Sequence, residues 1–254
     1  MSGKLTVIGL GPGHESQLTA QASEALASAQ ILYGYGPYLD RVPERAHQRR
    51  VASDNRQEIE RASDALMQAA HGASVAIVSG GDPGVFAMAA AVCQAMEQGP
   101  SSWRELELAI VPGVTGMLAV AARVGAPLGH DFCALSLSDN LKPWSIVEKR
   151  LQAAAAAGFV IALYNPISRA RPWQLDRAFE LLRELLPAHT PVVFGRAVNR
   201  VDECVHITPL SSALGAQADM ATCVIVGSSE TRLVQRPNQA PLVYTPRSLA
   251  ASST

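Results

Sequence analysis

Cysteine is scarce in this sequence, and its placement argues against a protein-held metal. The four cysteines, Cys93, Cys133, Cys204 and Cys223, lie far apart and form no Cys-x-x-Cys pair. The six histidines likewise contain no close pair with the spacing of metal ligands. Each cysteine is flanked by apolar or small residues, which favours reduced thiols in the core. We therefore expect no zinc or iron–sulfur site and no other bound metal.

The sequence also lacks an excess of either charge. It has 21 basic and 22 acidic residues and a formal net charge of -1. No overall field should therefore draw the protein to nucleic acid or to an anionic membrane. An anionic ligand must be held by local groups.

Long hydrophobic runs are missing as well. The longest apolar stretch, 153–164, is interrupted by Gly158 and is too short to span a bilayer. At the N-terminus a short apolar segment, 4–8, leads directly into glycines, without the long hydrophobic region of an export signal. We expect a cytoplasmic protein that does not bind membranes.

Short runs rich in valine, isoleucine and leucine alternate with helical patterns along the chain. With 48% hydrophobic and 17% charged residues, 254 residues can fill one large or two small α/β cores. The runs are continuously apolar, which is typical of strands covered on both faces in mainly parallel sheets. The expected strands are 5–8, 31–33, 75–79, 106–111, 132–137, 159–164, 191–195 and 222–227.

Three stripes of apolar residues at helical spacing predict helices between these strands. The first covers 18–29, and the Thr19 side chain can cap its N-terminus. The second covers 59–69. The third lies between Pro172 and Pro187, because proline has a fixed φ and no amide donor and therefore marks helix boundaries.

Turn-forming residues with little periodicity lie near the middle of the chain, at 125–131. They place a domain junction at about 114–130. We therefore predict an N-terminal α/β domain over 1–115 and a C-terminal α/β domain over 116–247. The small, polar residues of 248–254 predict a frayed tail.

The first expected strand ends in a glycine-rich turn, Gly9-Leu10-Gly11-Pro12-Gly13. A dinucleotide-binding loop exposes backbone amides and has its last glycine three residues after the second. Here Pro12 removes one amide, and Gly13 follows directly. The turn therefore argues against an NAD-dependent oxidoreductase and leaves open a simple tight turn between strand and loop.

Two further loops follow expected strands, at the edge where α/β sheets bind ligands. In the first, 79–86, Gly80 and Gly81 would let the backbone approach a ligand without a Cβ in the way. Asp82 would accept a hydrogen bond from an amine or a ribose hydroxyl, or it could cap the following helix. The second loop, 111–116, repeats this pattern, so the two loops could clasp one small molecule.

Together, in this order, these loops resemble those of the tetrapyrrole methylases. The shared motifs are GLGPG at 9–13, SGGDPGVF at 79–86, VPGVTG at 111–116 and an apolar strand ending in Tyr164. The resemblance extends from about Lys4 to about Arg247. Longer motifs narrow it to members that act on a corrin precursor: YGYGPYLDRV at 33–42, SLSDNLKPW at 136–144, YNPISRARPWQL at 164–175 and VIVGSSETR at 224–232.

The resemblance implies the class III methyltransferase fold, with two α/β domains and an active site in the trough between them. It also implies a homodimer that uses S-adenosyl-L-methionine and releases S-adenosyl-L-homocysteine. By position, the residues that would line the cofactor are Pro12, Gly80, Gly81, Asp82, Val85, Phe86, Thr115, Gly116, Tyr164, Asn165, Arg196, Ala197 and Thr222. His14 departs from the family pattern, because many members have an acidic or small residue there.

The resemblance further implies methylation of a ring carbon of the corrin precursor, with contraction of the macrocycle, in cobalamin biosynthesis. This tetrapyrrole carries many carboxylates, which guanidinium groups can bind through two parallel hydrogen bonds. The substrate-binding candidates are Arg56, Lys142 and Arg171, followed by Arg41, Arg49, Arg169 and Arg196. We expect Arg171 or Arg196 to anchor a carboxylate, because both lie near strand ends. The catalytic acid or base is left open among Asp139, His14 and Lys142.

Other functions fit the same fold. The chain could methylate uroporphyrinogen, diphthine or ribosomal RNA, although an RNA target would favour a basic face that the balanced charge does not provide. It could instead bind and deliver an unstable tetrapyrrole without turnover. The sequence does not distinguish a metal-free from a cobalt-bearing macrocycle.

Overall fold

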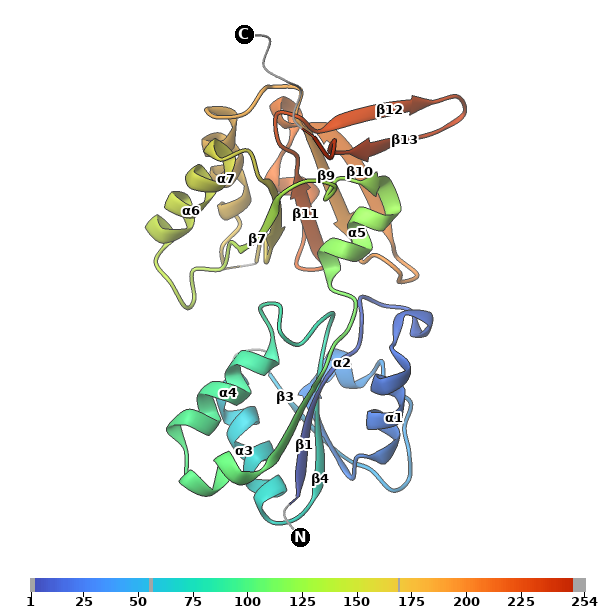
Figure 1. The fold of residues 1–254 in the computed structure, drawn as a ribbon, viewed down its shortest axis with the longest axis vertical. Helices are drawn as coiled ribbons and strands as arrows, with labels where there is room; N and C mark the ends of the chain where they lie inside the picture. The colour runs from blue at the N-terminus through green and yellow to red at the C-terminus, as the bar shows by residue number, and fades with distance from the viewer. Residues whose placement is uncertain (1–2, 55–56, 169, 249–254) are drawn as a thin grey trace. The chain divides into compact units, whose positions relative to one another are not determined.

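The computed structural model describes residues 3–54, 57–168 and 170–248, which belong to two compact units (Figure 1). The first unit is Met1–Thr115 and the second is Gly116–Thr254. The substrate candidates Arg56 and Arg169, and the predicted tail from residue 249 onward, lie outside the described residues. Each unit has its own sheet and its own core.

The first unit is built on a five-stranded sheet in which all neighbouring strands are parallel. The strand order is β3-β2-β4-β1-β5. Parallel pairing puts the carboxyl ends of all these strands at one edge, where loops of α/β proteins bind ligands. The strands are β1 (Lys4–Gly9), β2 (Ile31–Tyr35), β3 (Arg49–Ser53), β4 (Ser74–Ser79) and β5 (Glu107–Val111).

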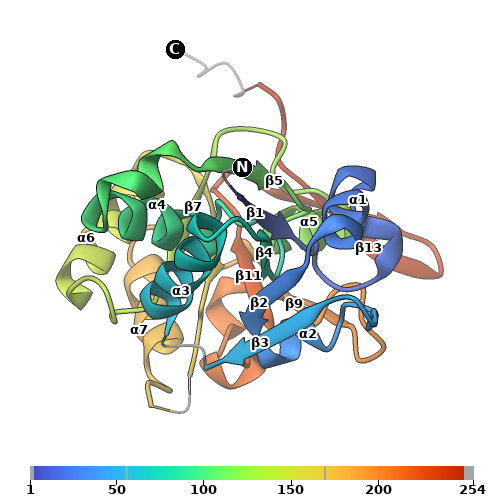
Figure 2. The same cartoon turned by 90° about the horizontal axis from the view of Figure 1, so that it is seen from below.

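Helices cover both faces of this sheet. They are η1 (Glu15–Gln17), α1 (Ala20–Ser28), α2 (Gly36–Leu39), α3 (Glu58–Ala70), α4 (Met88–Gln98) and η2 (Ser101–Glu105). One apolar core joins Val7 of β1 to Leu66 of α3 and Val92 of α4. A second core joins Ile8 of β1 to Leu26 of α1. Successive β1 side chains thus point to opposite faces, and Figure 2 shows α3 and α4 on one side of the strands and α1 on the other.

The second unit contains a mixed five-stranded sheet with the order β10-β9-β11-β8-β7. Its strands are β7 (Phe132–Ser136), β8 (Val160–Tyr164), β9 (Pro191–Arg196), β10 (Cys204–Pro209) and β11 (Thr222–Val226). Only β7 and β8 are parallel neighbours, and the other three pairings are antiparallel. The α/β fold class is confirmed, but the expected mainly parallel arrangement is wrong for this sheet. A continuous apolar run indicates burial on both faces and does not determine strand direction.

Helices cover both faces of the mixed sheet too. They are α5 (Gly116–Val124), α6 (Trp144–Ala156) and α7 (Gln174–Arg183), with η3 (Leu210–Ser212) and η4 (Gly215–Gln217). Leu151 of α6 and Phe179 of α7 belong to the core on one face. On the other face α5 packs so closely that a Cβ at Gly195 of β9 would lie 2.2 Å from Cγ2 of Val120.

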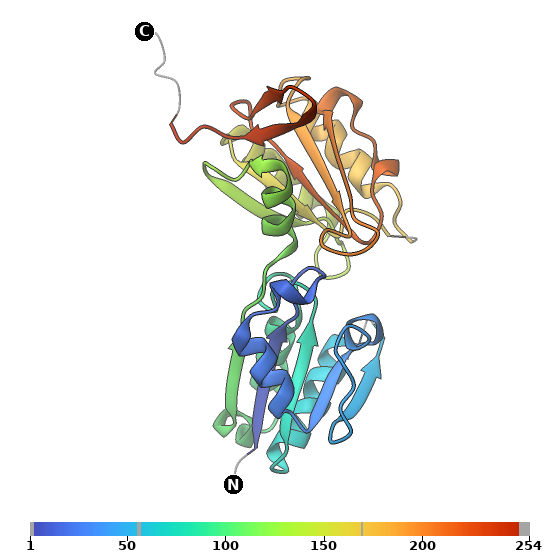
Figure 3. The same cartoon turned by 90° about the vertical axis from the view of Figure 1, so that its right-hand side faces the viewer.

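A three-stranded sheet completes the second unit. It consists of a hairpin, β12 (Arg232–Arg236) and β13 (Gln239–Tyr244), and the short strand β6 (Gly125–Ala126). The hairpin is drawn in red in Figure 3. β12 pairs antiparallel with β13, which in turn pairs parallel with β6.

All eight predicted strands and all three predicted helices are present. The Thr19 cap is confirmed, because its Oγ1 accepts a hydrogen bond from the Ala22 amide at 3.1 Å. Sequence patterning did not predict β3, β10, β12 or β13. Many of their side chains are exposed, so these strands lack the continuous apolar run that marks a strand covered on both faces.

Two of the four cysteines contradict the predicted core location. Cys93, on α4, and Cys204, at the start of β10, are exposed, whereas Cys133 is half-buried and Cys223 is buried. None of the four forms a disulfide. Flanking residues do not determine which face of a helix or edge strand a side chain occupies, which explains the error. Burial raises the pKa of Cys223 to about 12 and also raises the pKa of Cys133.

The described residues contain neither a membrane-spanning helix nor a metal-ligand cluster. No helix in residues 3–54, 57–168 and 170–248 combines the length and the apolarity needed to cross a bilayer. In the same ranges, no group of three or more His, Cys, Asp and Glu side chains is placed to hold a metal ion.

Candidate cofactor and substrate site

Three glycine-containing loops pack backbone against backbone at the carboxyl ends of β1, β4 and β5. Gly11 and Gly81 exchange two hydrogen bonds with N–O distances of 3.1 and 2.9 Å. Both have positive φ, 66° and 67°, in the left-handed region that favours glycine. A Cβ at Gly113 would lie 2.4 Å from the carbonyl oxygen of Gly81. These glycines therefore let the loops contact one another.

Asp82 ties two of these loops together. Its Oδ1 accepts a hydrogen bond from the Gly84 amide at 2.8 Å, and its Oδ2 accepts one from the Gly113 amide at 3.1 Å. The carboxylate thus joins the loop after β4 to the loop after β5. Each carboxylate oxygen has a second lone pair, so Asp82 can still accept a hydrogen bond from a ligand.

Position 80 needs a glycine because a side chain of the same protein packs against it. A Cβ at this position would lie 2.7 Å from Cζ of Tyr38, so a side chain of this chain fills the adjacent space. Tyr38 also packs edge-on against Tyr35, with ring centroids 5.5 Å apart. Sequence analysis missed Tyr38, because its contact with Gly80 joins two segments that are far apart in sequence.

Three of the predicted cofactor residues have a left-handed backbone conformation. Phe86, Asn165 and Ala197 have φ values of 52°, 50° and 47°. For a residue other than glycine this conformation costs about 1–2 kcal/mol, although asparagine tolerates it better. Such strained positions cluster at functional sites. Phe86 is also an exposed aromatic side chain, which suits contact with a ligand.

In the second unit, residues at the carboxyl end of β8 form a connected cluster. The Tyr164 hydroxyl accepts a hydrogen bond at 2.9 Å from the amide of Met117, in the first turn of α5. A Cβ at Gly116 would be in ordinary contact with the Tyr164 ring, at 3.7 Å. Asn165 donates from Nδ2 to Oγ of Ser136, at the end of β7, at 2.9 Å. Three predicted cofactor residues, Gly116, Tyr164 and Asn165, are therefore neighbours.

Arg196, at the end of β9, is paired with two carboxylates. Its Nε donates to Asp219 at 2.7 Å, and its Nη1 donates to Asp202 at 2.8 Å. Hydrogen bonds to Asp219 and Asp202 raise the pKa of Arg196. For Asp219, burial acts to raise the pKa, but hydrogen bonds from Arg196, Thr222 and Ala221 together lower it. This guanidinium is already neutralised, which disfavours it as the anchor of a substrate carboxylate.

Thr222 belongs to the same network. Its hydroxyl donates to Oδ1 of Asp219 at 2.8 Å, and Thr222 pairs with Arg196 across the strands β11 and β9. Ala197 donates its amide to the carbonyl of Ala221 at 3.0 Å. The structure thus brings together three residues predicted to line the cofactor, Arg196, Ala197 and Thr222. Asp219, the partner of Arg196 and Thr222, was not apparent from the sequence.

Arg171 and Lys142 lie in the loops that follow β8 and β7. Nη1 of Arg171 donates to Oδ1 of Asp139 at 2.8 Å and also to the side chain of Asn140. Nζ of Lys142 donates to the Ser138 carbonyl at 3.0 Å. Burial lowers the pKa of Lys142, as does the nearby Arg150, whereas Asp139 acts in the opposite direction. Of these two predicted substrate-binding residues, Arg171 is thus paired with Asp139, whereas Lys142 is bonded to a backbone carbonyl.

The other candidates have local partners or are exposed. Nη2 of Arg41 donates to the carbonyls of Leu10 and Gly11 at 3.1 and 2.8 Å, which supports the first glycine turn. Nδ1 of His14 accepts from the Ser16 amide at 3.1 Å and caps η1. Arg49 is exposed, Pro12 and Val85 are half-buried, and Thr115 is buried.

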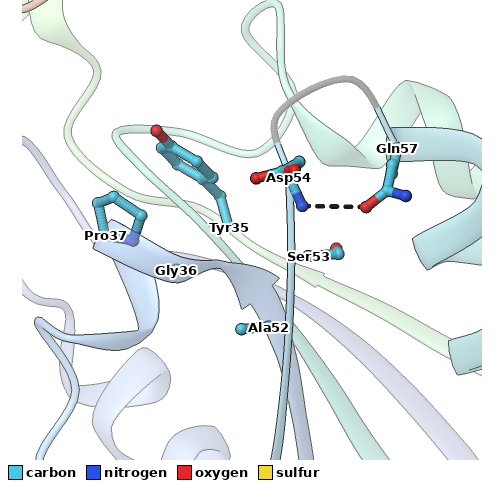
Figure 4. A pocket seen from close by; sticks show the side chains of 7 residues that line it. All are labelled: Tyr35, Gly36, Pro37, Ala52, Ser53, Asp54 and Gln57. Atoms are coloured by element: carbon cyan, nitrogen blue, oxygen red, sulfur yellow. Dashed lines mark hydrogen bonds between the residues drawn. The ribbon is translucent and has the colours of Figure 1, made fainter.

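A cleft of about 540 Å³ lies at the carboxyl ends of β2 and β3 (Figure 4). It is lined by Tyr35, Gly36, Pro37, Ala52, Ser53, Asp54 and Gln57, none of which is a predicted site residue. Arg61 of α3 is buried and donates to Oγ of Ser53 at 2.7 Å and to the Asp54 carbonyl at 2.6 Å. Burial lowers the pKa of Arg61. This guanidinium therefore supports the wall of the cleft.

The fold and the site define an α/β protein of two compact units, with candidate ligand residues in the loops at strand ends. The family model of the Tetrapyrrole (Corrin/Porphyrin) Methylases matches residues 4–214. The chain belongs to this family.

Two known proteins resemble the chain over all or nearly all of its length. A "Precorrin-3B C(17)-methyltransferase" of a Sinorhizobium species is 64% identical over 253 residues, covering 100% of both chains. The crystal structure of the methyltransferase CobJ has a TM-score of 0.91 at 47% identity and covers 96% of this chain and 100% of its own.

A more distant structure shares the fold. The uroporphyrin-III C-methyl transferase from Thermus thermophilus, complexed with S-adenyl homocysteine, has a TM-score of 0.67 at 22% identity. The match covers 89% of this chain and 98% of that one. At this identity the likeness concerns the fold alone.

Proposed function

We propose that this chain uses S-adenosyl-L-methionine to methylate precorrin-3B at carbon 17 and contracts the macrocycle to precorrin-4, in cobalamin biosynthesis. The observation that carries the proposal is the full-length identity of 64% to a relative named for methylation at this carbon. Family membership and the likeness to the methyltransferase CobJ support the same class of reaction.

The predicted cofactor residues suit S-adenosyl-L-methionine, which supplies a methyl group on a positively charged sulfur when bound. Phe86 offers an exposed aromatic face, and Asp82 has lone pairs left for an ammonium or a ribose hydroxyl. A carboxylate against the sulfur would stabilise the charged ground state more than the transition state. Asp82 therefore orients the cofactor through its polar groups, away from the sulfur.

The substrate is an electron-rich ring with many carboxylates. Arg171 and Lys142 provide the positive charge that binds it, and Arg171 can do so through two hydrogen bonds. Binding at fixed points lets the chain align the ring carbon with the methyl group at near-attack distance, which is the main source of rate in such a transfer.

The proposal is tested by incubating the purified protein with S-adenosyl-L-methionine and precorrin-3B without oxygen. We expect S-adenosyl-L-homocysteine and a product with the mass of precorrin-4. A parallel reaction with the cobalt-bearing macrocycle identifies which form is the substrate. Tetrapyrrole binding without any S-adenosyl-L-homocysteine would refute the proposal and support a carrier protein instead.

We also propose that the protein is a cytoplasmic homodimer, on the basis of the family resemblance. Obligate dimer interfaces are typically large and apolar, so the dimer should persist with and without cofactor. Light scattering at micromolar concentration should give the mass of two chains in both conditions. The mass of one chain would refute the dimer.

A further inference from the structure

We infer that Asp139 is a positioning residue that fixes the guanidinium of Arg171 for a carboxylate of the substrate. The inference rests on the proposed function, because it assigns a role within the same site. It also gives Asp139 a different role from the catalytic acid or base considered from the sequence.

The ion pair between these residues connects two neighbouring loops. Asp139 follows β7 and Arg171 follows β8, and these strands are parallel neighbours, so both loops leave the sheet at the same edge. Oδ1 of Asp139 lies 2.8 Å from Nη1 of Arg171. The side chains are only 26% and 20% exposed, so solvent screens this pair less than a fully exposed one.

One edge of the Arg171 guanidinium is held by hydrogen bonds, and the Nε of the other edge lacks a partner among the described residues. The hydrogen bonds to Asp139 and Asn140 both come from Nη1. Nε is buried and has no hydrogen-bond acceptor among the described residues. A buried donor without an acceptor is unfavourable, and native proteins rarely retain one without a functional reason. Nε and Nη2 form the edge that binds a carboxylate through two parallel hydrogen bonds.

The surrounding charges also favour an anion. Lys142 and Arg150 lie close enough to influence one another, and Asp139 is the carboxylate that acts on Lys142. Lys142 and Arg171 lie in the loops after β7 and β8, which leave the sheet at the same edge, and two positive side chains at this edge favour an anion there.

The experiment measures binding of precorrin-3B without turnover. The protein is saturated with S-adenosyl-L-homocysteine and titrated with precorrin-3B in the absence of oxygen. The signal is quenching of tryptophan fluorescence, because Trp144 and Trp173 adjoin the two loops and pack together with ring centroids 4.9 Å apart. Calorimetric titration of S-adenosyl-L-homocysteine into each variant checks that the fold and the cofactor site are intact.

We expect Asp139→Asn to raise the Kd for precorrin-3B about tenfold, as loss of a charge-assisted contact would. The effect should disappear in an Arg171→Ala background, because Asp139 acts through Arg171. Asp139→Glu should restore part of the affinity. Glu180→Gln, which breaks an ion pair with Arg177 on α7, is the matched control and should bind normally.

Four results would separate the possibilities. Wild-type affinity in a folded Asp139→Asn protein, or an equal loss of affinity in the Arg171→Ala background, would overturn the inference. A fall in kcat with a changed pH profile and unchanged binding would assign Asp139 to proton transfer and overturn it too. Binding of precorrin-3B without conversion would refute the proposed function and leave this test of Asp139 valid.

Discussion

Replacing Gly81 by valine should abolish cofactor binding and leave the protein folded. Gly81 has a φ of 67° and exchanges two hydrogen bonds with Gly11, so its conformation joins two loops of the candidate site. A residue with a Cβ is destabilised by about 1–2 kcal/mol in this conformation, and a β-branched residue lies at the upper end of that range. The free energy of unfolding of a native protein is about 5–15 kcal/mol, so most molecules of the variant remain folded. The melting temperature should fall by about 2–8 °C.

The control is Gly158→Val, because Gly158 has a φ of 79° and, apart from its chain neighbours, no heavy atom of the described residues lies within 4 Å of a Cβ built there. This variant has the same backbone strain at a position after α6, outside the candidate site. Both variants should lose similar stability by thermal unfolding. Calorimetric titration with S-adenosyl-L-homocysteine should show binding to Gly158→Val and none to Gly81→Val. Wild-type affinity in a folded Gly81→Val protein would refute the reasoning.

Three further predictions concern individual side chains. Cys93 and Cys204 are exposed, so a thiol reagent should modify them in the folded protein before the other two cysteines, as peptide mass mapping would show. The pKa of Asp219 is lowered from 3.8, so the ionised carboxylate stabilises the folded protein above pH 3.8, and this stabilisation is lost as the pH falls further. The melting temperatures of Asp219→Asn and wild type should therefore converge in acid. A difference that stays constant with pH would contradict this. Tyr33 donates to Asp64 at 2.8 Å, and burial, together with this hydrogen bond, raises its pKa to about 12. Tyr33→Phe should lower the free energy of unfolding by about 0.5–1.5 kcal/mol below pH 10, as measured by denaturant titration. This difference from wild type should shrink between pH 10 and pH 12, and a difference that grows would contradict the reasoning.

The loops of the candidate site could be placed from the sequence, because they follow strands that are easy to recognise. The loops at 79–86 and 111–116 lie where predicted, at the carboxyl ends of β4 and β5. Their internal contacts could not be predicted in the same way. Gly80 is next to the Tyr38 ring, and Asp82 bonds the Gly113 amide, and both contacts join distant segments.

The same limit applies to charged residues. Arg171 and Arg196 are equivalent by sequence, since each lies near the end of a strand. In the structure Arg196 is paired with two carboxylates, whereas the Nε of Arg171 lacks an acceptor among the described residues. This difference decides which arginine suits a substrate carboxylate, and it depends on the positions of Asp202 and Asp219.

The sequence by itself determined the strands covered on both faces, the three predicted helices and the order of the loops of the candidate site. These features are local, because side-chain periodicity and turn chemistry act over a few residues. The tertiary structure decided the antiparallel pairings of β8, β9, β10 and β11, the exposure of Cys93 and Cys204, and the partners of each charged group. Those features depend on which distant segments become neighbours, and that is settled only when the sheets pair and the helices pack against them.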